Sequence, residues 1–148
     1  MSLEREISLF ESLLESIAEG EVTRDPDGDY VLNYGGACFY ARVIGEVHPI
    51  VQLFSVVATD VPAIPDLLSY INDANCQVTF VRTLHVLNQV LVEADMLVSE
   101  LSATSFHTLC RHIATVSDEI GNGLVDIFDA KPRWQLGKKK DYAFGFNM

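Results

Sequence analysis

Hydrophobic residues recur at every third or fourth position near both ends of the chain. Over residues 2–19 they form one stripe, with glutamates on the opposite face, and Gly20 follows. Over residues 102–129 the same spacing continues for longer, and Ser102 is a favourable N-cap. This periodicity predicts an amphipathic helix at each end of the domain.

Between these helices the pattern changes to short apolar runs separated by glycine, proline or asparagine. Strands are predicted at residues 29–34, 37–44, 47–58, 78–86 and 89–94, with a short helix from Pro65 that ends near Asn75. Glycine or asparagine in the intervening turns favours hairpins. The order α-β-β-β-α-β-β-α predicts an antiparallel-rich α+β domain with helices packed on one face of the sheet.

The strands at residues 37–44 and 47–58 are apolar on both faces. A sheet with one face in water alternates between apolar and polar residues, so the second face is expected to be covered. Its cover is the protein's own tail, a second subunit or a partner, and the sequence leaves these alternatives open. In an isolated subunit we expect Tyr40, Ile50 and Phe54 to be partly exposed. Aspartate at Phe54 is then expected to abolish partner capture without unfolding the protein.

Charge divides the chain into an acidic body and a basic tail. The net charge is −11, but residues 1–130 carry −15 and residues 131–148 carry +4. We interpret residues 1–130 as a single domain. An acidic body repels phosphates, so neither nucleic acid nor a membrane is expected as a partner. Three widely spaced cysteines without a CxxC motif are typical of reduced, buried thiols in a cytoplasmic protein.

The tail at residues 131–148 combines a lysine run with aromatic residues. It is too aromatic to serve only as a solvated segment, so we expect it to dock on its own domain or on a sister subunit. The candidate partner-binding residues are therefore Tyr40, Ile50, Phe54, Trp134, Phe144 and Phe146.

No residue pattern in the sequence carries a catalytic, cofactor or metal signature. Residues 25–29 carry alternating aspartates, as some calcium-binding loops do. In an EF-hand loop the glycine follows the third acidic ligand, whereas here Gly28 precedes Asp29. A Pro/Gly/Asp turn therefore explains these residues better. His107 and His112 point about 140° apart on the last helix, so they do not converge on a metal. A non-enzymatic binding module is the favoured interpretation. The alternative is a small-ligand sensor or an enzyme whose pocket cannot be read from sequence.

Four segments carry a likeness to a known family. They are LLSYINDAN at residues 67–75, VTFVR at 78–82, VLVEADM at 90–96 and SDEI at 117–120. A helix with two nearby asparagines that leads into a strand of the type x-F-x-R, followed by a strand and a long closing helix, resembles the YbjN-like bacterial proteins. Asn72 and Asn75 also have a simpler interpretation as a helix stop.

The resemblance covers roughly residues 4–130 and leaves the tail outside. YbjN-like proteins are described as sensory-transduction regulators, and they share a fold with type III secretion chaperones, which are small, acidic, often dimeric proteins that bind peptide segments. The resemblance implies a type III secretion chaperone-like fold. It also implies a protein- or peptide-binding role, chaperone-like or regulatory, through an apolar sheet face or edge, with a homodimer as one arrangement. Fold alone does not fix function.

Overall fold

A six-stranded antiparallel sheet is the centre of the computed structural model, which describes residues 3–35 and 37–131. The strands are β1 (Thr23–Arg24), β2 (Tyr30–Tyr34), β3 (Ala37–Ile44), β4 (Ile50–Ala58), β5 (Arg82–Val86) and β6 (Gln89–Leu97). They lie in the order β1-β2-β3-β4-β6-β5. The helices are α1 (Leu3–Ile17), α2 (Pro65–Asn75) and α3 (Ala103–Phe128), and a short 3-10 turn, η1 (Val98–Glu100), precedes α3.

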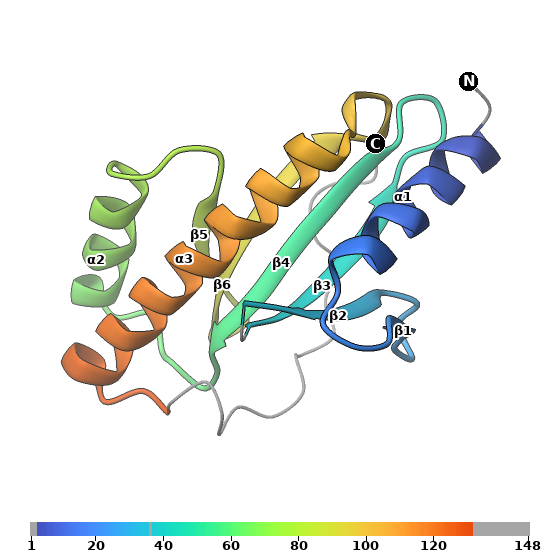
Figure 1. Ribbon diagram of the computed structural model, residues 1–148. Coiled ribbons are helices and arrows are strands. Elements are labelled where there is room, and N and C mark those ends of the chain that lie inside the picture. The colour runs from blue at the N-terminus through green and yellow to red at the C-terminus, as the bar shows by residue number, and fades with distance from the viewer. Residues whose placement is uncertain (1–2, 36, 132–148) are drawn as a thin grey trace.

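The three helices pack on one face of the sheet, as predicted. α1 and α3 cross this face, and α2 stands beside α3 near the β5 edge (Figure 1). Phe10 of α1, Leu67 of α2 and Ile113 of α3 belong to one buried cluster with Phe39 and Leu53 of the sheet. The α+β architecture and the order of its main elements confirm the fold predicted from the sequence.

Local signals set the ends of α3. The hydroxyl of Ser102 accepts a hydrogen bond from the Ser105 amide at 3.1 Å, and the Ser105 hydroxyl accepts one from the Ser102 amide at 3.0 Å. Asp129 adopts a left-handed conformation with φ 54° and ends the helix. Over the described chain, no helix combines the length and apolar character needed to cross a bilayer.

Two predicted strands begin later than expected. The strand expected from residue 78 begins at Arg82, because Phe80 has φ 67°, a left-handed conformation that interrupts an extended strand. The strand expected from residue 47 begins at Ile50, since Gly45 has φ 86° and Val47 is 83% exposed in the connecting loop. The two-residue strand β1 was not expected, and it pairs with β2 at the sheet edge.

Candidate functional site

The face of the sheet opposite the helices, called the rear face below, carries the described residues predicted to bind a partner. Cross-strand pairing aligns Tyr40 of β3, Phe54 of β4, Glu93 of β6 and Arg82 of β5 in one row. Paired residues lie on the same face of a sheet, and successive residues lie on opposite faces. Because Leu53 belongs to the core under the helices, this row points to the rear.

A stacked aromatic pair is the centre of the rear face. The rings of Tyr40 and Phe54 have centroids 5.2 Å apart and planes 18° apart. The Arg42 guanidinium lies 5.2 Å from the centroid of the Phe54 ring. Leu91 and Val56 complete an apolar cluster that is separate from the main core. The predicted second apolar face of the sheet is therefore present.

The exposure of these residues corrects part of the prediction. Tyr40 and Ile50 are half-buried, as expected, but Phe54 is only 1% exposed. Phe54 lies on a central strand, stacked against Tyr40 and in contact with Leu91, which is 0% exposed. Aspartate at Phe54 is therefore expected to unfold the protein. The remaining candidates, Trp134, Phe144 and Phe146, lie outside the described residues.

Two ion-pair groups flank the aromatic pair. On one side, Arg42 donates Nε and Nη2 to the two carboxylate oxygens of Asp29, at 2.9 and 2.6 Å. On the other side, Arg82 pairs with Oε1 of Glu93 and donates to Oδ2 of Asp95 at 2.8 Å. Burial raises the pKa of Glu93 above its ordinary value, and the positive charge of Arg82 opposes that rise. The rear face thus has an aromatic centre between charged borders.

Two buried acceptor atoms on the rear face lack a hydrogen-bond donor among the described residues. They are Oε1 of Gln52 and Oε2 of Glu93, in residues that are 4% and 1% exposed. Across the two strands Gln52 is paired with Asp95, and Phe54 is paired with Glu93. The two pairs are neighbours on the same face of the sheet. A buried acceptor without a donor costs about 1–3 kcal/mol. A segment that brings N–H or ammonium donors would remove this cost.

The aspartate-rich turn at residues 25–29 has a structural explanation, as predicted. Oδ1 of Asp25 accepts hydrogen bonds from the amides of Asp27 at 3.1 Å and Asp29 at 2.9 Å. The three carboxylates lie within 4.8 Å of one another. That of Asp29 is held by Arg42, so it helps to fix the edge of the rear face.

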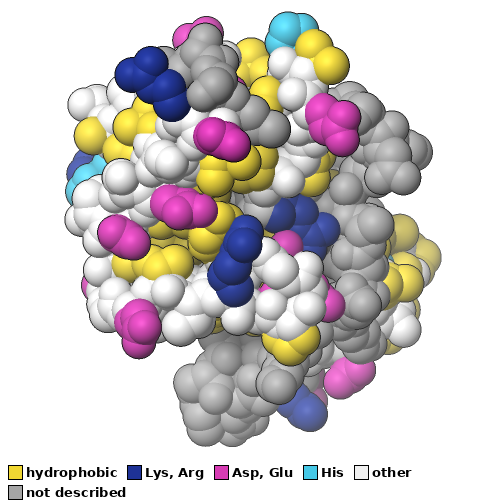
Figure 2. Space-filling view, turned by 90° about the vertical axis from the view of Figure 1, so that its right-hand side faces the viewer, with side chains coloured by type: hydrophobic (Ala, Val, Ile, Leu, Met, Phe, Trp, Pro, Cys, Tyr) yellow, Lys and Arg dark blue, Asp and Glu magenta, His cyan; other side chains and the backbone are white. Residues whose placement is uncertain are grey.

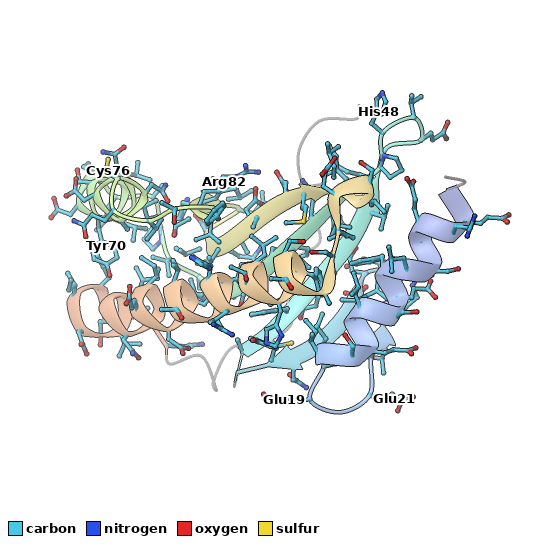
Figure 3. All side chains as sticks on the ribbon, turned by 45° about the horizontal axis from the view of Figure 1, so that its top comes forward. Glu19, Glu21, His48, Tyr70, Cys76 and Arg82 are labelled. Atoms are coloured by element: carbon cyan, nitrogen blue, oxygen red, sulfur yellow. The ribbon has the colours of Figure 1, made fainter. Side chains whose placement is uncertain are left out.

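A groove between α2 and α3 is a second surface, which was not predicted. Tyr70 points from α2 toward α3 (Figure 3), and its ring centroid lies 5.7 Å from that of Phe128. Cavities of about 280 and 710 Å³ share Tyr70 and Asp73 in their walls. Their acidic lining residues are Asp66, Asp73, Glu119 and Asp129, and their aliphatic ones include Ile64, Val78, Val116, Ile120 and Ile127. Burial is the largest cause that raises the pKa of Tyr70, and the negative charges of Glu119 and Asp126 raise it further.

Gly123→Ala is expected to swing Tyr70 out of this groove. A Cβ on Gly123 would lie 1.9 Å from the Tyr70 hydroxyl oxygen, so the ring would have to move. Glycine to alanine in a helix otherwise gains about 1 kcal/mol. The substitution should therefore stabilise a Tyr70→Ala background but not the natural protein. Thermal unfolding of the four proteins measures the coupling, and equal effects in both backgrounds would contradict the close contact.

Acidic side chains extend over the surface beyond these two sites. Figure 2, which views the α1 side of the molecule, shows Asp and Glu side chains scattered among hydrophobic ones. α1 alone carries Glu4, Glu6, Glu11 and Glu15. The α1 side of the molecule therefore favours cationic partners.

Comparisons with known proteins bear directly on this fold. A search of the curated proteins finds no match. The type III secretion chaperone SycH of Yersinia pestis, solved in complex with a stable fragment of YscM2, superposes with a TM-score of 0.57 and 11% identity. The alignment covers 77% of this chain and 98% of that one. Residues 5–132 match the family described as "T3SS (YopN, CesT) and YbjN peptide-binding chaperone 1". The resemblance seen in the sequence is confirmed, and the chain belongs to this family of peptide-binding chaperones.

Proposed function

We propose that the protein acts without catalysis, by binding an extended, basic and apolar segment of a partner protein on its rear face. The observation that carries this proposal is the stacked Tyr40–Phe54 pair on the sheet face away from the helices, beside buried acceptors that have no donor among the described residues. The family match supports binding of a peptide, and the aromatic pair supports the rear face as the place where it binds.

The chemistry of the rear face specifies the kind of segment. An extended segment presents every second side chain to one surface, so alternate apolar residues would meet Tyr40 and its neighbours. Lysine or arginine side chains, or free backbone amides, would donate to Gln52 and Glu93. The charge of −15 on residues 1–130 also favours basic segments and speeds their encounter with the protein.

Tyr40→Ser is expected to weaken peptide binding about tenfold or more, as loss of an aromatic anchor does. The probes are peptides selected on the full chain from a random phage-displayed library, then measured by fluorescence anisotropy. Phe80→Ser is the matched control, because Phe80 is 75% exposed and lies away from the rear face. Its ring centroid is 5.4 Å from that of His112 on α3. Equal losses in the two variants, or none in Tyr40→Ser, would remove the rear face as the site.

The three cysteines provide a second measurement on the natural chain. Cys38 is exposed on the rear side of β3, and Cys76 is exposed at the end of α2 (Figure 3), so the expectation of buried thiols is wrong for these two and holds for Cys110. A selected peptide should slow alkylation of Cys38 and leave that of Cys76 unchanged, as read by mass spectrometry. Cys110 should stay unmodified in both cases, since burial raises its thiol pKa to about 12. Protection of Cys76 in place of Cys38 would move the site to α2.

A further inference from the structure

We infer that residues 132–148 are the resident occupant of the rear face, an internal ligand that a partner segment must displace. These residues lie outside the described part of the chain. The displacement by a partner rests on the proposed function, whereas the docking of the segment rests on the observations below.

The burial of the rear face requires a cover. Phe54 and Leu91 are 1% and 0% exposed on the face from which the described helices are absent. Large apolar side chains at the centre of a sheet face in contact with water keep part of their surface exposed. The near-complete burial of this cluster therefore indicates that the rear face is covered by another chain segment.

The end of the described chain lies within reach of the rear face. Asp129 lines the same cavity as Ile64, which lies in the connection after β4, so α3 ends beside the chain that leaves β4. The amide of Ala130 donates to the Leu124 carbonyl at 3.2 Å and fixes the exit from the helix. Seventeen residues follow Lys131, enough to extend about 55 Å. A nine-residue strand such as β4 extends about 30 Å, so the segment can cross the whole face.

The sequence of the segment matches the chemistry of the rear face. Tyr142, Phe144, Phe146 and Met148 alternate with Ala143, Gly145 and Asn147. In an extended conformation the side chains of Tyr142, Phe144, Phe146 and Met148 would lie on the same side of the segment, and that side can pack on the Tyr40–Phe54 cluster. Preceding this stripe, residues 138–140 are three lysines, whose ammonium groups can donate to the acceptor atoms of Gln52 and Glu93 that have no donor in the described part of the chain.

An internal ligand sets a threshold for partners. A tethered segment competes at an effective concentration that reaches the millimolar range for short flexible linkers. The charges of +4 and −15 attract only weakly through salt solution, so the aromatic stripe must supply most of the affinity. A partner segment then binds when its own apolar and basic contacts exceed those of the tail.

The test uses the full chain and a labelled synthetic peptide of residues 132–148. The tail variant carries Tyr142→Ser, Phe144→Ser and Phe146→Ser, and its matched control carries Ala143→Ser, Gly145→Ser and Asn147→Ser on the other side of the segment. The peptide should bind the tail variant about a hundredfold more tightly than it binds the natural protein or the control. Equal binding to all three proteins, or binding to none, would overturn the inference.

Two further outcomes locate the bound peptide and separate the inference from the proposed function. Adding Tyr40→Ser to the tail variant should abolish binding of the synthetic peptide, and retained binding would overturn docking on the rear face. If selected phage peptides bind the rear face but the tail peptide does not, the inference fails and the proposed function stands. If the tail peptide binds there and protects Cys38 while no selected peptide does, docking is supported, and the proposed function fails together with displacement by a partner.

Discussion

Arg82→Leu is expected to lower the free energy of unfolding by about 2–3 kcal/mol at neutral pH. The Arg82 side chain is 50% exposed, but it neutralises Glu93, whose side chain is 2% exposed. Removing the arginine leaves the Glu93 carboxylate buried and paired with no described cation. The expected loss is smaller than for a fully buried pair, because solvent already screens the exposed half of Arg82.

The loss should shrink as the pH falls. In the folded protein the pKa of Glu93 lies above its ordinary value of 4.5, chiefly through burial, and Arg82 limits that rise. Without Arg82 the pKa rises further. The folded state then binds a proton more strongly than the unfolded state, so stability is gained as the pH falls through the folded pKa toward 4.5. Urea unfolding of both proteins across the acidic and neutral range measures this.

Two variants control for the charge and for the loss of the arginine itself. Arg82→Leu combined with Glu93→Leu should recover most of the stability lost by the single variant, because no buried charge remains. Arg111→Leu removes an exposed arginine from α3 and should change stability little. A double variant as unstable as Arg82→Leu would show that packing, and not the Glu93 charge, determines the loss.

The sequence predicts the elements of this fold well, because their signals are local. The 3.6-residue stripe of α3 and its Ser102 cap lie within the helix that they define. The start of β5 was missed because it depends on a contact with another element. Asn75 at the end of α2 donates to the Thr83 carbonyl at 3.0 Å and accepts from the Thr83 amide at 2.8 Å, which ties β5 to the helix. A helix stop describes only part of the role of Asn75.

The candidate site was predictable only in part. Alternation along β3 and β4 places Tyr40 and Phe54 on the second face, because side chains of a strand alternate with a period of two. Phe54 shares its buried cluster with Leu91, which the non-sequential pairing of β4 with β6 brings to the same face. The rear-face acceptors without a donor in residues 3–35 and 37–131, and the contact of Tyr70 with Gly123, likewise depend on distances between elements that no local pattern contains.

Phe54→Ala is expected to cost about 3–5 kcal/mol of unfolding free energy, as removal of a fully buried phenylalanine does. Phe54 is 1% exposed on the rear face, and Phe39 is 0% exposed under the helices. Phe39→Ala is therefore the matched control, with a loss in the same range. Phe54→Asp should unfold the protein, because it would place a carboxylate among the rings and aliphatic side chains of the rear cluster.

The same pair of variants tests whether the cover of the rear face contributes to stability. If residues 132–148 bury Phe54, the tail variant exposes it, and Phe54→Ala then costs less in that background than in the natural chain. Phe39→Ala should cost the same in both backgrounds, because its neighbours belong to the main core. Urea unfolding of the six proteins gives the two coupling energies. An unchanged cost for Phe54→Ala would show that strand neighbours such as Tyr40 and Leu91 suffice to bury it, which would leave the rear face free for a partner without any displacement.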